Sequence, residues 1–199
     1  MKYDWKDENV HEKVLQFIAI AYMNDFDKET LLQIIQEKNL EDNLEIIRFI
    51  WHLYRDNPAD KLDDIFRLWE TIYNLYKDDQ SDDMHQVFST LSNWFVFVEK
   101  TDDTNIAWMK VSAKFTEVNY NSYFLIEQLL RLVEQNAKDV GNVYLEMLNN
   151  DVFPTYKEED IVAIVEKLFE VGEVTQAREI CNKYAAEGIY FLNIINKQY

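Results

Sequence analysis

Between Tyr156 and Leu192, apolar residues recur every three to four positions, which places them on one face of an α-helix. Those before a break at Gly172 are Ile161, Ile164, Val165, Leu168 and Phe169, and those after it are Val174, Ala177, Ile180, Cys181 and Tyr184. The pattern predicts a helical hairpin. Two such helices cannot bury both apolar faces against each other alone, so the hairpin predicts neighbouring helices of the same kind.

The same spacing continues through the upstream chain, and turn-forming residues are scarce. Only 3 Gly and 2 Pro occur among 199 residues. Sheet proteins rely on these residues in their turns, so the chain is poorly suited to building hairpins or a parallel sheet. We therefore predict an all-α fold of about ten antiparallel helices joined by short turns. Asp27, for example, is expected to cap the second helix.

Helix pairs recur with a period of about 30 to 45 residues, which is typical of helical solenoids. We expect a single domain over residues 1–199, folded as a right-handed helical-repeat solenoid. Its expected sub-units are residues 1–40, 41–80, 81–119, 120–150 and 151–199. The period is unequal and no residue motif is common to all units, so an irregular helical bundle is the alternative.

Three residues of the C-terminal hairpin resemble a tetratricopeptide repeat. Leu168 precedes Gly172 in the turn, and Ala177 follows five positions later, where a small residue lets the two helices approach. Val165 and Tyr184 stand where that family uses small residues. The middle units, with longer helices and acidic turns, are more similar to HEAT or armadillo repeats. These resemblances imply a protein-binding helical scaffold.

A further resemblance rests on the run VYLEMLNNDVFPTYKEEDIV, followed by Gly172-x4-Ala177 and by CNKYAAEGIYFL. These segments are similar to helical C-terminal regions that follow a sirtuin-like or NTPase domain in large bacterial defence proteins. That resemblance implies a recognition or scaffolding part of a longer polypeptide. It carries no catalytic residues across, because it does not include the enzyme domain.

The chain is strongly acidic, with 37 Asp and Glu against 20 Lys and Arg and a net charge of -17. This charge disfavours nucleic acid and anionic membranes as partners, because both are bound through positive surfaces. A basic protein remains an open partner. The chain starts without an apolar leader and has no run long enough to span a membrane, so we expect a cytoplasmic protein. Its single cysteine, Cys181, lies on a predicted buried stripe and is expected in the core.

Metal binding and catalysis receive little support. Glu8 with His11 fits the Glu-x-x-His spacing of di-iron helical bundles, and Asp82 with His85 is an aspartate variant of it. Both pairs fall in the first turn of a predicted helix, where acidic residues favour the helix dipole and side chains project to solvent. No Gly-rich phosphate loop or G-x-S-x-G motif occurs. We therefore predict no metal, no cofactor and no enzymatic activity.

Exposed aromatic side chains with an acidic rim are the expected working surface. The aromatic residues that fall off the buried stripes are Trp5, Trp108, Tyr120, Tyr123 and Tyr190. The acidic clusters are Asp56, Asp60, Asp63 and Asp64, and Asp78, Asp79, Asp82 and Asp83. We expect a non-catalytic module that binds another protein, or the remainder of a larger chain. The alternatives are a metal- or small-molecule-binding bundle, and an acidic immunity or accessory protein for a basic partner.

Overall fold

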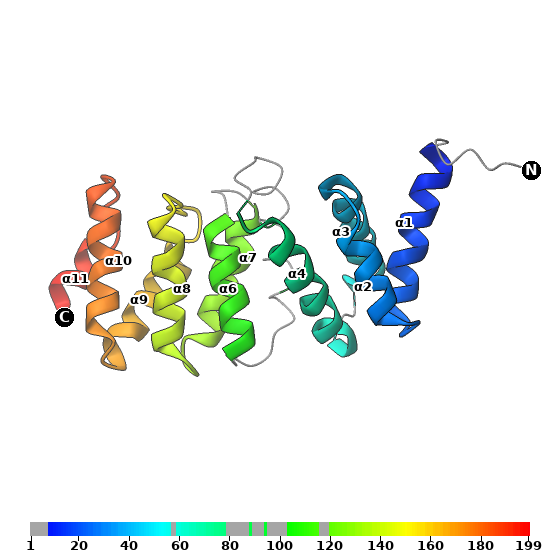
Figure 1. Ribbon diagram of the computed structural model, residues 1–199. Helices are drawn as coiled ribbons and strands as arrows, with labels where there is room; N and C mark the ends of the chain where they lie inside the picture. Colours follow the sequence, from blue (N-terminus) through cyan, green and yellow to red (C-terminus); the bar gives the residue numbers. More distant parts are fainter. Residues whose placement is uncertain (1–7, 57–58, 79–87, 89–93, 95–102, 116–119) are drawn as a thin grey trace, which may run out of the picture. The chain divides into compact units, whose positions relative to one another are not determined.

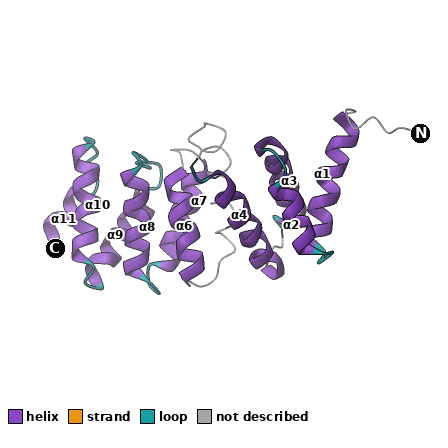
Figure 2. Cartoon of the chain, viewed as in Figure 1, coloured by secondary structure: helices purple, strands orange, loops and turns teal. Residues whose placement is uncertain are grey.

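The computed structural model describes residues 8–56, 59–78, 88, 94, 103–115 and 120–199. Within these residues the chain forms ten α-helices and one 3-10 helix, and no strand occurs among them (Figure 2). The predicted all-α fold is therefore confirmed. Contacts between Cα atoms divide the chain into two compact units, Met1–Met84 and His85–Tyr199, here called unit 1 and unit 2. The single repeat domain with five sub-units stays a prediction.

Unit 1 contains four described α-helices whose ends follow local sequence signals. They are α1 (Glu8–Met23), α2 (Lys28–Gln36), α3 (Leu40–Tyr54) and α4 (Leu62–Tyr76), with the 3-10 helix η1 (Ala59–Lys61) before α4 (Figure 1). Asp27 accepts a hydrogen bond from the backbone N–H of Thr30 and so caps α2, as predicted. Helix α1 packs against α3 and α2, and α2 packs against α4.

Unit 2 contains six described α-helices that pack in two rows. They are α6 (Asp103–Phe115), α7 (Tyr120–Leu132), α8 (Ala137–Asn149), α9 (Glu158–Glu170), α10 (Val174–Ala186) and α11 (Asn193–Gln198). In Figure 1, α6, α8 and α10 run side by side, and α8 contacts both other members of this row. Helix α9 likewise contacts α7 and α11 in the second row. Such packing of alternate helices is typical of helical repeats.

The hairpin of α9 and α10 forms where its sequence predicts it. Gly172 turns the chain with φ of 93°, in the left-handed region that glycine adopts without strain. Its N–H donates to the carbonyl of Phe169, and the next N–H donates to that of Leu168. The apolar residues predicted for α9 are all buried. Val174 is an exception in α10, because it is 38 % exposed rather than part of the buried stripe.

A buried polar chain joins α8, α10 and the segment before α9. Tyr184 donates a hydrogen bond to the carbonyl of Pro154 over 3.0 Å, and the Tyr144 hydroxyl lies 2.8 Å from that of Tyr184. Since the single proton of Tyr184 is used on Pro154, Tyr144 is the donor in the second bond. These two hydrogen bonds hold the start of α9 in a fixed position. Cys181, on α10 like Tyr184, is 1 % exposed, which confirms its predicted core position.

Candidate functional site

The predicted aromatic surface residues occupy different environments. Trp108 is only 8 % exposed, because α6 packs against both α7 and α8 and so buries more than one stripe. This placement corrects the prediction that Trp108 lies on the surface. Tyr123 is half-buried on α7, and Tyr190 is 62 % exposed between α10 and α11. Trp5 and the side chain of Tyr120 lie outside the described residues.

The predicted acidic residues also differ in their exposure. Asp60, Asp63 and Asp78 are exposed, whereas Asp64 is partly buried and paired with a lysine of α2. Asp79, Asp82 and Asp83 lie outside the described residues. Two other clusters of polar side chains, one in each unit, do form around a lysine.

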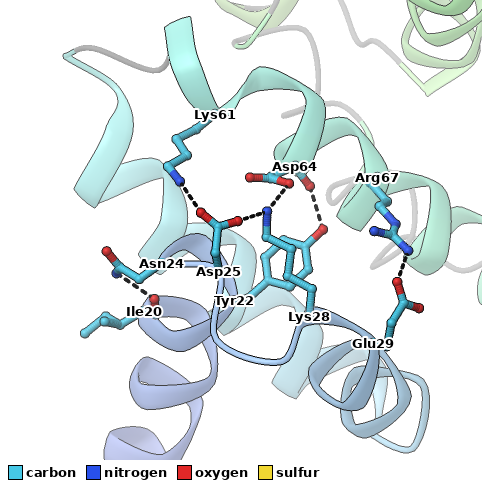
Figure 3. A network of polar contacts seen from close by, with 9 residues as sticks. All are labelled: Ile20, Tyr22, Asn24, Asp25, Lys28, Glu29, Lys61, Asp64 and Arg67. Atoms are coloured by element: carbon cyan, nitrogen blue, oxygen red, sulfur yellow. Dashed lines mark hydrogen bonds and ion pairs between the residues drawn. The ribbon is translucent and has the colours of Figure 1, made fainter.

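The cluster in unit 1 is centred on Lys28, at the start of α2 (Figure 3). Its ammonium group pairs with Asp25 and lies 2.5 Å from Asp64 on α4. Tyr22 donates a hydrogen bond of 2.9 Å to the backbone carbonyl of Asp64. Lys61 lies 3.4 Å from Asp25 and completes the link between the α1–α2 turn and the start of α4. The cluster thus fastens three helices of unit 1 together.

The ion-paired residues of this unit 1 cluster are balanced in charge. Its acidic members are Asp25, Glu29 and Asp64, and its basic members are Lys28, Lys61 and Arg67, with Arg67 paired to Glu29. Hydrogen bonds from Lys28 and Lys61 lower the pKa of Asp25. Burial opposes the charged form of Lys28, but its bonds to Asp25 and Asp64 raise its pKa overall.

The cluster in unit 2 lies where α9 begins beside α7. Its pocket, here called the α9 pocket, is lined by Tyr123, Thr155, Tyr156, Lys157, Glu158, Glu159 and Asp160. Lys157 lies 2.9 Å from Glu127 and 3.1 Å from Asp160, and its ammonium group sits 4.3 Å from the ring centre of Tyr123. The hydrogen bonds to Glu127 and Asp160 raise the pKa of Lys157. This lysine is therefore fully charged at neutral pH.

The α9 pocket carries an excess of negative charge. Its surroundings hold Glu127, Glu158, Glu159 and Asp160 against Lys157 as the single base among the lining residues and their ion-pair partners. Glu158 and Glu159 are exposed and form no ion pair within the described part of the chain. Tyr156 is 58 % exposed at the same place. The pocket therefore joins an aromatic ring to carboxylates that are available for an outside cation.

The start of α9 shows what sequence reasoning could have found. The predicted surface included Tyr123 but not Tyr156 or the acidic first turn after it. The sequence signal for this site is the run from Tyr156 to Asp160, which places a tyrosine and three acids together. This run follows the buried Pro154, at the end of the segment that connects α8 to α9. The contact between Lys157 and Glu127 spans 30 residues and is not visible in any local pattern.

Two further features lie on unit 1. A pocket between α1 and α3 is lined by Glu12, Leu15, Gln16, Glu45, Arg48, Phe49 and His52. Arg48 is paired with Glu45 over 2.6 Å, and Glu12 accepts a hydrogen bond from Gln16. His11, which fits the Glu-x-x-His spacing, lies 2.6 Å from the buried Asp42 of α3. His11 thus joins α1 to α3 rather than facing a bundle centre.

No cluster of three or more metal-ligating His, Cys, Asp or Glu side chains occurs among the described residues. His85 and Asp82 lie outside them. Burial raises the pKa of the Cys181 thiol to about 11, so the thiol is protonated at neutral pH and a poor nucleophile. None of the described helices combines the length and the apolar character needed to cross a membrane.

The comparisons with known proteins returned no match. Neither a family model, nor a curated protein, nor a solved structure is significantly similar to this chain.

Proposed function

We propose that this chain is a non-catalytic protein-interaction module whose α9 pocket binds a basic segment of another protein. The observation that carries the proposal is the charge imbalance at the start of α9, next to an exposed tyrosine. Glu158 and Glu159 have no cation in the described structure, and the exposed Tyr156 lines the same pocket. A guanidinium group suits this combination, because it pairs with carboxylates and stacks on aromatic rings.

Two effects compete at this position. The N-terminus of α9 carries a partial positive charge of roughly half a unit, which favours anions. Against it stand Glu127, Glu158, Glu159 and Asp160, which Lys157 offsets by only one unit. The carboxylates outweigh the dipole, so the pocket attracts cations. An anionic ligand at this helix start is correspondingly disfavoured.

The stacked helices of unit 2 support the same role. Its two helix rows resemble the helical-repeat scaffolds that bind proteins through extended surfaces. In one row α8 contacts α6 and α10, and in the other α9 contacts α7 and α11. This support is an analogy of fold and by itself names no partner. The choice of a basic partner comes from the pocket and from the net charge of -17. A solenoid belonging to a larger protein is the architecture that fits this role.

A peptide titration tests the proposal. The probe is a fluorescein-labelled amphipathic 16-residue peptide with Arg and Leu, and its counterpart has every Arg replaced by Glu. We expect anisotropy to rise with the Arg peptide only. The double variant Glu158→Lys with Glu159→Lys should weaken binding about 10- to 30-fold, since each close charge contact contributes on the order of 1 kcal/mol in water.

The matched control is the double variant Glu37→Lys with Glu187→Lys. It makes the same change in net charge at two exposed residues outside the α9 pocket that have no ion pair in the described structure. We expect this control to keep most of the affinity. If both double variants weaken binding equally, the peptide responds to net charge and not to the pocket. The absence of binding by the Arg peptide would also reject the proposal.

A further inference from the structure

The outer face of α1 carries an apolar stripe that the packing of unit 1 leaves exposed. Helix α1 packs against α2 and α3, and the side chains that it buries include Leu15, Ile18 and Tyr22. On the opposite side of the helix, Phe17 is 63 % exposed and Ile20 is 43 % exposed. Among the described helices, α1 alone exposes two large apolar side chains. Such a pair on one face indicates a surface that another helix can cover.

The exposed stripe has the spacing of a coiled-coil seam. It consists of Lys13, Phe17, Ile20 and Asn24, which follow one another at intervals of four, three and four residues. These intervals place all four side chains on one helix face, as the a and d positions of a heptad do. The order of the intervals is the same in both chain directions, so two antiparallel copies of the stripe align all of its layers.

The two ends of the stripe are complementary as hydrogen-bonding groups. Lys13 is exposed and has no ion pair within the described part of unit 1. Asn24 continues the helix, because its backbone N–H donates to the carbonyl of Ile20. The side-chain amide nitrogen of Asn24 donates to the same carbonyl over 2.8 Å (Figure 3), which leaves the amide oxygen able to accept a further bond. The ammonium group of a lysine is a suitable donor to this oxygen.

The charge of the stripe distinguishes between kinds of partner. Residues 13–24 contain one Lys and no Asp or Glu, although the chain as a whole carries a net charge of -17. A basic segment of the kind proposed for the α9 pocket therefore finds no carboxylate on this stripe. A second copy, by contrast, meets no like charge in the seam, because the antiparallel arrangement sets Lys13 opposite Asn24 and not opposite another Lys13.

We propose that the outer face of α1 is a twofold interface between two copies of this chain. A twofold axis perpendicular to α1, midway between residues 18 and 19, relates two antiparallel α1 helices. Phe17 of each copy then lies in one layer with the partner's Ile20, and Lys13 in one layer with the partner's Asn24. Each layer occurs twice, as in the isologous interfaces of most homodimers. A seam of this length is small, so the dissociation constant should be on the order of 10 µM.

Sedimentation equilibrium of the full chain tests the interface, over concentrations from about 5 to about 200 µM. The wild-type chain should approach twice its mass of 23.9 kDa at the upper end. The double variant Phe17→Ser with Ile20→Ser should raise the dimer dissociation constant about 30-fold or more, since each lost side chain is buried twice in the dimer. The matched control, Tyr190→Ser with Ile194→Ser, removes two exposed apolar side chains of unit 2 and should leave the constant unchanged.

A pair of charge changes tests the antiparallel register. Asn24→Lys alone sets like charges against each other in both end layers and should raise the dissociation constant about 5- to 20-fold. Adding Lys13→Glu to this variant places opposite charges in the same layers. The constant should then return to within about 3-fold of the wild-type value. Circular dichroism verifies that every variant is folded, which the exposure of the changed residues favours.

Three outcomes overturn the proposal. The first is a wild-type chain that stays monomeric at about 200 µM, well above the expected dissociation constant. The second is a Phe17→Ser, Ile20→Ser variant that dimerises as tightly as wild type, which would place the interface elsewhere. The third is a failure of Lys13→Glu to rescue Asn24→Lys, the result expected if the stripe covers a different protein or pairs in another register.

Discussion

The two units share one arrangement of side chains and use it differently. In each, a lysine pairs with two carboxylates and lies over a tyrosine ring: Lys28 with Asp25, Asp64 and Tyr22, and Lys157 with Glu127, Asp160 and Tyr123. Around Lys28 the ion-paired charges cancel, and the tyrosine is fully buried. Around Lys157 two more exposed glutamates follow, and the tyrosine is half-buried.

This difference separates a structural cluster from a candidate binding surface. Ion-paired charges beside a buried tyrosine link helices and are already satisfied by one another. An excess of carboxylates beside exposed rings leaves a field that a cation can complete. A lysine between two acids is therefore not by itself a sign of a binding site. Unpaired carboxylates around such a lysine are the sign of one.

The largest expected difference concerns the two tyrosines. Tyr22→Ala removes a side chain with 0 % exposure and should cost about 3 to 5 kcal/mol, through the cavity and the lost bond to Asp64. Tyr123→Ala removes a half-buried ring and should cost about 1 kcal/mol. Hydrogen exchange read by mass spectrometry reports each unit separately, so protection of α4 should fall far more than that of α9.

Tyr22→Phe is the control for this pair, because it keeps the ring and removes only the hydroxyl. It should cost about 1 kcal/mol, the usual net value of one hydrogen bond. Equal losses of protection for Tyr22→Ala and Tyr123→Ala would mean that both clusters are structural, and the distinction between them would fail.

The second prediction concerns the lysines. Lys157→Gln removes the single base of the α9 pocket, so the Arg peptide should bind about 2- to 5-fold more tightly at low salt. Lys28→Gln should leave peptide affinity unchanged and lower the protection of α2 and α4, because Asp25 and Asp64 lose their shared partner. Fluorescence anisotropy and hydrogen exchange measure the two effects. Weaker peptide binding by the Lys157 variant would show that the ammonium group positions the site instead.

Sequence patterns predicted the helices well and the sites poorly, for a physical reason. Apolar spacing is local, so the buried faces of α9 and the turn at Gly172 follow from it directly. Trp108 was misplaced because α6 has neighbours on two sides, which widens its buried face beyond one stripe. Val174 was misplaced in the opposite sense, since α10 leaves one face uncovered.

The ion pairs escaped prediction because they join distant residues. Lys28 and Asp64 are 36 residues apart, and Lys157 and Glu127 are 30 apart. An acidic first turn looks the same in sequence whether a lysine neutralises it or not. Glu158 and Glu159 therefore became a candidate site only once the packing of α7 beside α9 showed which carboxylates already had a partner.

The smallest expected effect concerns acid stability of the balanced cluster. Bonds from Lys28 and Lys61 lower the pKa of Asp25 from its ordinary value of 3.8, so folding favours its ionised form. The unfolded chain then binds more protons than the folded chain below about pH 4, and this part of the stability is lost as pH falls through the lowered pKa. The difference in melting temperature between wild type and the Asp25→Asn variant should therefore become smaller as the pH drops from 5 to 2. Asparagine tolerates the left-handed φ of 62° at this residue, and Asp151→Asn, at φ of 60°, controls for the backbone. A difference that stays constant across this pH range would show that the Asp25 carboxylate does not contribute through its charge.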